Sequence, residues 1–104
     1  MGYNLAKGFS RAGHDQWIRE VHLPDMNKVP GLEKIILNRT ERVVVGHDLP
    51  EYVAELHYPD MDAYLAGRSW IRRHPFPRDS RPEGKIIIRY MLVCQSRDLK
   101  DRRF

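Results

Sequence analysis

Four stretches of apolar residues along the chain have the spacing of β-strands. Residues 3–9 form a short and weak first candidate, and residues 52–58 alternate between two faces. The β-branched clusters within residues 32–46 predict one long strand, bulged near 38–40. The alternative is a tight hairpin at 38–40, although the sequence there lacks the Asn-Gly or Asp-Gly turn that hairpins favour. Residues 85–94 form the strongest candidate, and their unbroken apolar run at 86–88 predicts burial on both faces.

Two further stretches have helical spacing. From about His14, the four-residue spacing of Trp17 and Val21 predicts a helix that weakens before Pro24, because proline lacks an N–H donor. Residues 30–31, a Pro-Gly pair, then end this segment. A second helix begins after Asp60, which is a good N-cap, and is expected to end near Gly67.

The resulting element order is β-α-β-β-α-β. It predicts an α+β protein of the ferredoxin-like class, with two helices on one face of a four-stranded antiparallel sheet. The length of 104 residues fits a single domain over 1–104, with a polar tail at 95–104. The second sheet face has no helix to cover it, so we expect a homodimer in which two such faces close into an α+β barrel.

Composition narrows the class of protein. The formal net charge is +4, and the cations are mainly arginine, with thirteen Arg and five Lys. The single cysteine excludes an internal disulfide. No apolar run is long enough to span a membrane, and the first residues lack the apolar core of a signal peptide. A cytoplasmic protein is therefore expected. The Arg- and Pro-rich residues 72–84 are interpreted as a solvated loop rather than as a nucleic-acid platform.

His22 is the leading candidate for chemistry. It shares a helix flank with Ile18, which places it on the inward side near the end of the first helix, where an imidazole can transfer protons near neutral pH. A structural histidine that bonds a backbone carbonyl is the alternative. Glu55 and His57 lie on one face of the third strand and are candidate partners for His22 if that face lines a pocket; if it faces a dimer partner, Tyr52 and Tyr58 take that place instead.

Several side chains have the chemistry of a pocket for a flat aromatic ring, although each aromatic residue alone is more often part of a core. His74 is expected near a pocket mouth, and Arg89, if buried, needs Glu55 or a ligand carboxylate as its partner. Cys94 is expected to be a buried thiol. The histidines follow no metal-ligand spacing and no phosphate loop occurs, so neither a metal nor another cofactor is expected. The candidate ligand-binding residues are Trp17, Tyr52, Tyr64, Trp70, His74 and Arg89, with Phe76 as a further aromatic candidate.

The spacing Trp17, His22, Pro24, Pro30 and Gly31, followed by "YVAELHYPDMDAYLAG", resembles the EthD family of dimeric α+β barrel proteins. The resemblance to the EthD family covers about residues 14–68. It implies the barrel dimer and matches His22 to the histidine of the family's H-x-P motif. Within that family, the chain also resembles the EthD-like proteins of the RedY type from prodiginine pigment pathways. The broader superfamily of dimeric α+β barrel proteins contains cyclases, monooxygenases, isomerases and haem-degrading enzymes. The resemblance therefore does not identify the reaction.

Together these observations predict a small-molecule-binding protein of secondary metabolism, without a membrane or nucleic-acid partner. Its ligand is expected to be an aromatic or heteroaromatic intermediate. If the protein is catalytic, we expect cofactor-free cyclisation, isomerisation or condensation, with a monooxygenase-like reaction as a further type, and with His22, His57 and Glu55 as the catalytic residues. The alternative is a non-catalytic carrier that shields a reactive intermediate for a pathway enzyme. A nucleic-acid binder that uses residues 72–84 is the third hypothesis.

Overall fold

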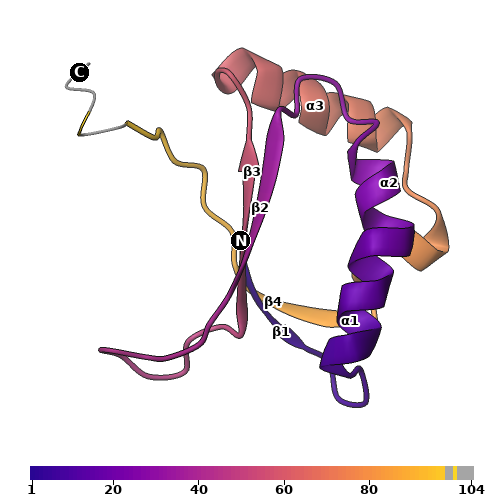
Figure 1. The fold of residues 1–104 in the computed structure, drawn as a ribbon. Helices are drawn as coiled ribbons and strands as arrows, with labels where there is room; N and C mark the ends of the chain where they lie inside the picture. Colours follow the sequence, from indigo (N-terminus) through magenta and orange to yellow (C-terminus); the bar gives the residue numbers. More distant parts are fainter. Residues whose placement is uncertain (98–99, 101–104) are drawn as a thin grey trace.

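Four antiparallel strands form one sheet in the order β2-β3-β1-β4, and the helices lie against one of its faces (Figure 1). The computed structural model describes residues 1–97 and 100, so part of the polar tail predicted at 95–104 lies outside the described residues. The strands are β1 (Gly2–Leu5), β2 (Lys34–Arg39), β3 (Tyr52–His57) and β4 (Ile86–Tyr90). This arrangement is α+β and compatible with the ferredoxin-like fold predicted from the element order.

The first helix is longer than predicted and contains a widened turn. It begins at Arg11 behind Ser10, whose hydroxyl accepts a hydrogen bond from the Gly13 N–H at 2.9 Å. It continues as α1 (Arg11–Trp17), a π-helical turn (Ile18–His22) and α2 (Leu23–Met26). The expected weakening before Pro24 takes the form of this π-helical turn, but the helix does not stop there and continues to Met26. The Leu23 N–H donates to the Ile18 carbonyl, five residues back, which makes this turn wider than an α-helical turn. Proline has no N–H, so one carbonyl of the preceding turn lacks its usual donor, and the wider turn accommodates this loss.

The last helix, α3 (Met61–Arg73), also extends beyond its predicted end. Asp60 caps it as expected, accepting a hydrogen bond from the Ala63 N–H at 2.8 Å. Gly67 does not end the helix. It is buried, and a Cβ atom there would lie 3.0 Å from the Tyr58 ring, so this glycine allows α3 to pack closely. Trp70 therefore lies within α3.

Three strands end earlier than the apolar pattern predicted, and the first of them, β1, ends at Leu5 instead of residue 9. β2 stops at Arg39, and residues 40–51 form a loop whose base is closed by a hydrogen bond from the Thr40 N–H to the Glu51 carbonyl at 2.8 Å. β4 is an edge strand, and the prediction that it is buried on both faces is wrong, because Ile87 and Ile88 are 54% and 43% exposed. Cys94 follows β4 and is exposed rather than buried.

The core includes the contact of α1 with β1 and β3, where the His14 ring lies against Tyr3 and Tyr52. Its buried apolar residues in the described part of the chain are Tyr3, Trp17, Met26, Val29 and Tyr52. Because the Tyr52 ring contacts His14 of α1, the face of β3 that carries Tyr52 faces the helices, and the face that carries Glu55 and His57 points away from them. No helix among the described residues is long and apolar enough to cross a membrane.

Candidate functional site

His22 occupies the last position of the π-helical turn, and its ring is oriented by a loop that is distant in sequence. Its Nδ1 lies 2.8 Å from the Ser80 carbonyl oxygen and 3.2 Å from the Ser80 hydroxyl. Because a carbonyl oxygen only accepts hydrogen bonds, Nδ1 must carry the proton, which leaves Nε2 with its lone pair when the ring is neutral. Among the described residues, Nε2 has no hydrogen-bond partner. The bond to the Ser80 carbonyl is the one expected of a structural histidine, and the unbonded Nε2 also leaves the ring able to act as a general base.

Aromatic rings hold the His22 imidazole on two sides. Trp17 stacks on it, with ring centroids 4.7 Å apart and planes 19° apart, and Phe76 meets it edge-on at 6.0 Å. The Trp17 indole N–H donates to the Asp79 carbonyl at 2.6 Å, so the same loop is bonded to both rings. Trp17 is 7% exposed, which makes it a residue that positions His22 rather than one with surface to offer a ligand.

Burial lowers the pKa of His22 from its ordinary value of 6.5, while the bond to the Ser80 carbonyl and the charge of Asp25 act in the opposite direction. The imidazole is therefore neutral at pH 7, and its Nε2 can accept a proton.

A stability change with pH follows from this shift. Because the pKa is lower in the folded protein, the unfolded chain binds the proton more readily, so the free energy of unfolding is expected to fall as the pH drops below about 6.5. Urea titrations at pH 7.5, 6.5 and 5.5 measure this loss, and a His22→Gln variant should lose less stability over the same range. His47→Gln, which alters an exposed histidine, is the control. The same loss in wild type and His22→Gln would contradict the assignment.

A second histidine, His14, lies completely buried next to this cluster. Its Nδ1 lies 3.2 Å from the Asp15 carboxylate, and its Nε2 lies 2.7 Å from the Tyr3 hydroxyl. Since the carboxylate accepts from Nδ1–H, the Tyr3 hydroxyl donates to Nε2. Tyr52 stacks on Tyr3 with ring centroids 5.3 Å apart, yet its buried hydroxyl has no hydrogen-bond partner among the residues that the structure describes. Burial is the main cause that raises the pKa of both phenols, so both stay protonated at neutral pH.

The two tyrosines are expected to respond oppositely to the loss of their hydroxyls. Tyr52→Phe removes an unpaired buried hydroxyl and should stabilise the fold by about 1 kcal/mol, whereas Tyr3→Phe leaves His14 Nε2 without a donor and should cost about 1–3 kcal/mol. Urea unfolding of the two variants side by side measures both changes. If Tyr52→Phe destabilised the protein as much as Tyr3→Phe, the Tyr52 hydroxyl would have to be hydrogen-bonded.

The other predicted catalytic residues, His57 and Glu55, lie on the sheet face away from the helices, so the structure does not bring them to His22. His57 Nε2 and Glu55 Oε1 lie 3.2 Å apart, and the Asn38 amide donates to the other Glu55 oxygen at 3.0 Å. The bond from Asn38, followed by that from His57, lowers the pKa of Glu55. Glu55 is thus a carboxylate that orients His57 and not an acid that donates a proton.

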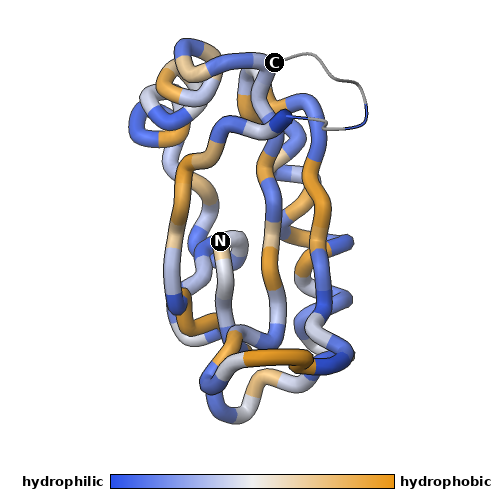
Figure 2. Tube along the Cα trace, turned by 90° about the vertical axis from the view of Figure 1, so that its left-hand side faces the viewer, coloured by the Kyte–Doolittle hydropathy of each residue, from blue (hydrophilic) through white to orange (hydrophobic). Residues whose placement is uncertain are grey.

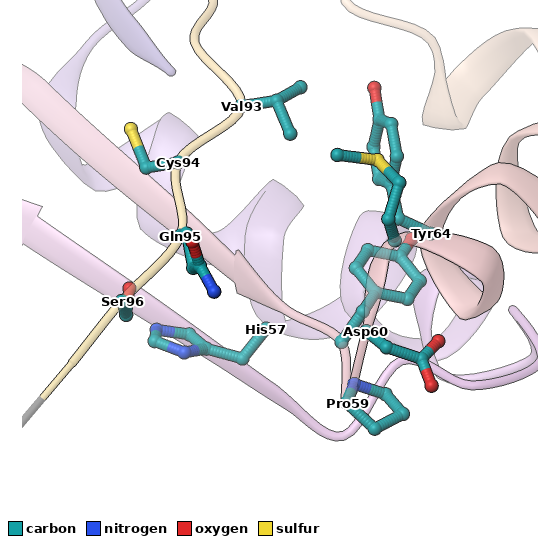
Figure 3. Close-up of a pocket in the computed structure, with 10 residues that line it drawn as sticks. His57, Pro59, Asp60, Tyr64, Val93, Cys94, Gln95 and Ser96 are labelled. Carbon is teal, nitrogen blue, oxygen red and sulfur yellow. The ribbon is translucent and has the colours of Figure 1, made fainter. Parts of the chain in front are cut away.

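His57 does border a cavity, of about 720 Å³, where β3 meets α3 (Figure 3). His57, Asp60 and Tyr64 lie on one side of it, and residues 93–96 lie on the other. The Cys94 thiol points away from His57 (Figure 3). The cavity therefore has aromatic walls but contains no nucleophile aligned with a base.

The remaining predicted ligand-binding residues are dispersed. Tyr64 meets Tyr58 edge-on, with ring centroids 5.5 Å apart. Trp70 stacks on His74 at the end of α3, where the His74 ring donates to the Trp70 carbonyl at 3.0 Å. Arg89 is exposed on the edge strand. Because it is not buried, it does not need a charged partner. Of the predicted aromatic candidates, Trp17 and Phe76 contact His22 directly.

Sequence reasoning missed the partners that give His22 and His14 their properties. Ser80 lies 58 residues from His22, and Tyr3 lies 11 residues from His14, so neither pair has a spacing that local periodicity can detect. Only the adjacent pair of His14 and Asp15 could have been recognised as a hydrogen-bonded unit in the sequence.

Comparisons of the chain with protein-family models, with curated proteins and with solved structures find no match. The resemblance to the EthD family thus stays a prediction from the motif residues.

Proposed function

We propose that this protein is a homodimer that binds a small aromatic or heteroaromatic metabolite and transfers protons on it with His22 as a cofactor-free general base. The observation that supports this function is the state of His22. Its Nδ1 proton is bound by the Ser80 carbonyl, its pKa is lowered by burial, and its Nε2 has no partner in the described residues. A base with a pKa somewhat below the working pH is neutral and ready to accept a proton.

The rings around His22 support an aromatic ligand. Phe76 lies edge-on to the imidazole, and both residues are only partly buried. Aromatic ligands favour such edge and face contacts, which contribute about 0.5–1.5 kcal/mol each beyond the burial of area. The motif shared with EthD proteins, in which His22 belongs to the H-x-P element, supports a role in a biosynthetic pathway for an aromatic secondary metabolite.

The apolar surface supports the homodimer. Val44, Val45 and Leu92 are 87%, 85% and 70% exposed, and they belong to the loop after β2 and the segment after β4. Both segments extend on the side of the sheet away from the helices (Figure 1), and Figure 2 looks onto this side. Full burial of one such side chain contributes about 1.5–3 kcal/mol, and a second copy provides an equally apolar surface.

The elimination of 5-nitrobenzisoxazole tests the base. In this reaction a base removes the ring C–H proton while the N–O bond breaks, which gives a coloured cyanophenolate without any cofactor. We expect the protein to accelerate it, and we expect His22→Gln to reduce the rate above buffer by about 100-fold or more. The rate should rise with pH below 6.5 and level off by pH 7, because burial lowers the pKa of the base.

His47→Gln is the matched control, because it changes an exposed histidine in the loop after β2. A rate that is equal in wild type and His22→Gln would reject His22 as the base. Binding of the substrate without acceleration in either protein would instead favour the non-catalytic carrier.

A further inference from the structure

A basic pocket lies in the loop that orients His22. Its volume is about 390 Å³, and it lies between the end of the 3-10 turn at Arg78–Ser80 and the start of β4. Three cations and two carboxylates line it: Arg78, Asp79, Arg81, Glu83 and Lys85. All of them except Lys85 belong to the Arg- and Pro-rich residues 72–84, and the proposed proton transfer assigns no role to their charged side chains.

The pocket adjoins the His22 cluster through backbone and side-chain contacts. The Asp79 carbonyl accepts the Trp17 indole N–H, and the next residue, Ser80, accepts the His22 Nδ1 proton. The Lys85 ammonium lies 5.6 Å from the Trp17 ring centroid. His22 and Phe76 are both only partly buried, and Phe76 precedes Arg78 of the pocket wall by two residues in the chain.

Two of the three cations, Arg81 and Lys85, bond backbone carbonyls, and none of the three has a counterion among the described residues. Arg81 Nε donates to the Phe76 carbonyl at 3.0 Å, and Lys85 Nζ lies 3.4 Å from the Arg81 carbonyl. In the described part of the chain, neither Asp79 nor Glu83 forms an ion pair with any of the three cations. An arginine has five N–H donors, so Arg81 retains donors after its one backbone bond.

We propose that this pocket binds the carboxylate of an aromatic or heteroaromatic carboxylic acid whose ring lies against His22 and Phe76. The assignment rests on the proposed function, because it names the ligand class for the same site. Planar carboxylates match the donor geometry of arginine. Three cations and two carboxylates leave a net charge of +1, which one carboxylate neutralises, whereas a phosphate dianion would leave the pocket with a net charge of −1.

The test compares 2-naphthoate with 2-naphthamide, which have the same ring and differ in charge. Binding is followed by ¹H–¹⁵N NMR titration of the full chain. We expect the naphthoate to bind roughly tenfold more tightly than the amide, and we expect Arg78→Gln to reduce this preference by about threefold to tenfold. Arg73→Gln, which makes the same charge change on α3 outside the pocket, should leave the preference unchanged.

The remaining measurements separate this inference from the proposed function. Equal binding of both compounds, with shifts at His22 and Phe76, would overturn the carboxylate site while leaving the proposed function intact. Naphthoate binding that shifts Arg78 and Arg81 but neither His22 nor Phe76 would retain the pocket and reject the proposed function. Competition by inorganic phosphate or by a single-stranded oligonucleotide at lower concentration than naphthoate would also overturn the assignment. The naphthoate preference should weaken as salt is raised from 50 to 300 mM, and a preference unchanged by salt would contradict an ionic site.

Discussion

Replacement of Trp17 with alanine is expected to lower the free energy of unfolding by about 3–5 kcal/mol. This is a large share of the roughly 5–15 kcal/mol that stabilises a domain. Trp17 is one of the few buried apolar residues in the described part of the chain, and it contacts Phe9, His14 and His22. Thermal or urea unfolding measures the loss. The loop that holds His22 should also detach, because the bond from the indole to Asp79 disappears.

Trp17→Phe is the matched variant, since it keeps a ring against His22 but removes the indole N–H. We expect it to cost clearly less than Trp17→Ala, with the remaining deficit coming from the smaller ring and the unpaired Asp79 carbonyl. Wild-type stability in Trp17→Ala would contradict the assignment of Trp17 to the core.

Introduction of aspartate at Val44 and Leu92 together is expected to convert the dimer to a monomer. Both side chains are largely exposed in the single chain and would be buried against the second copy. Each substitution occurs twice in a symmetric dimer, so the interface would acquire four buried charges. The expected penalty of several kcal/mol weakens association by more than about 100-fold. Sedimentation at micromolar concentration distinguishes the two states.

Leu65→Asp is the control for charge alone, because Leu65 is 54% exposed on α3 and belongs to neither of the two extended segments. This variant should sediment like wild type. A wild-type protein that is monomeric at these concentrations, or a double variant that remains dimeric, would reject the proposed interface.

The fold was predictable because its main signals are local. Alternation within residues 52–58 and the Asp60 cap predicted β3 and the start of α3 correctly, and the element order predicted the sheet. The errors arose where tertiary contacts override local preference. Gly67 continues α3 because Tyr58 packs against it, and the π-helical turn lets the first helix pass Pro24. Val43, Val44 and Val45 have high β-propensity, but β3 pairs with this part of the chain only over Lys34–Arg39, so β2 ends at Arg39.

The candidate site was only partly predictable. The four-residue spacing of His22 and Ile18 placed His22 on the inward side, where it is half-buried, but it could not reveal Ser80 or the lowered pKa. The alternative faces of the third strand could not be separated by periodicity, because both carry polar and apolar groups. The Tyr52 contact with His14 is what assigns that face to the helices and leaves His57 and Glu55 on the other side.

The state of the His22 ring tests the central claim most directly. A long-range ¹H–¹⁵N correlation spectrum of the histidine side chains at pH 7 distinguishes the two neutral tautomers and the imidazolium by their nitrogen shifts. We predict a neutral ring with the proton on Nδ1 and the lone pair on Nε2, since Nδ1 lies 2.8 Å from the Ser80 carbonyl oxygen. A spectrum in which His22 carries its proton on Nε2, or on both nitrogens, would contradict its assignment as the base.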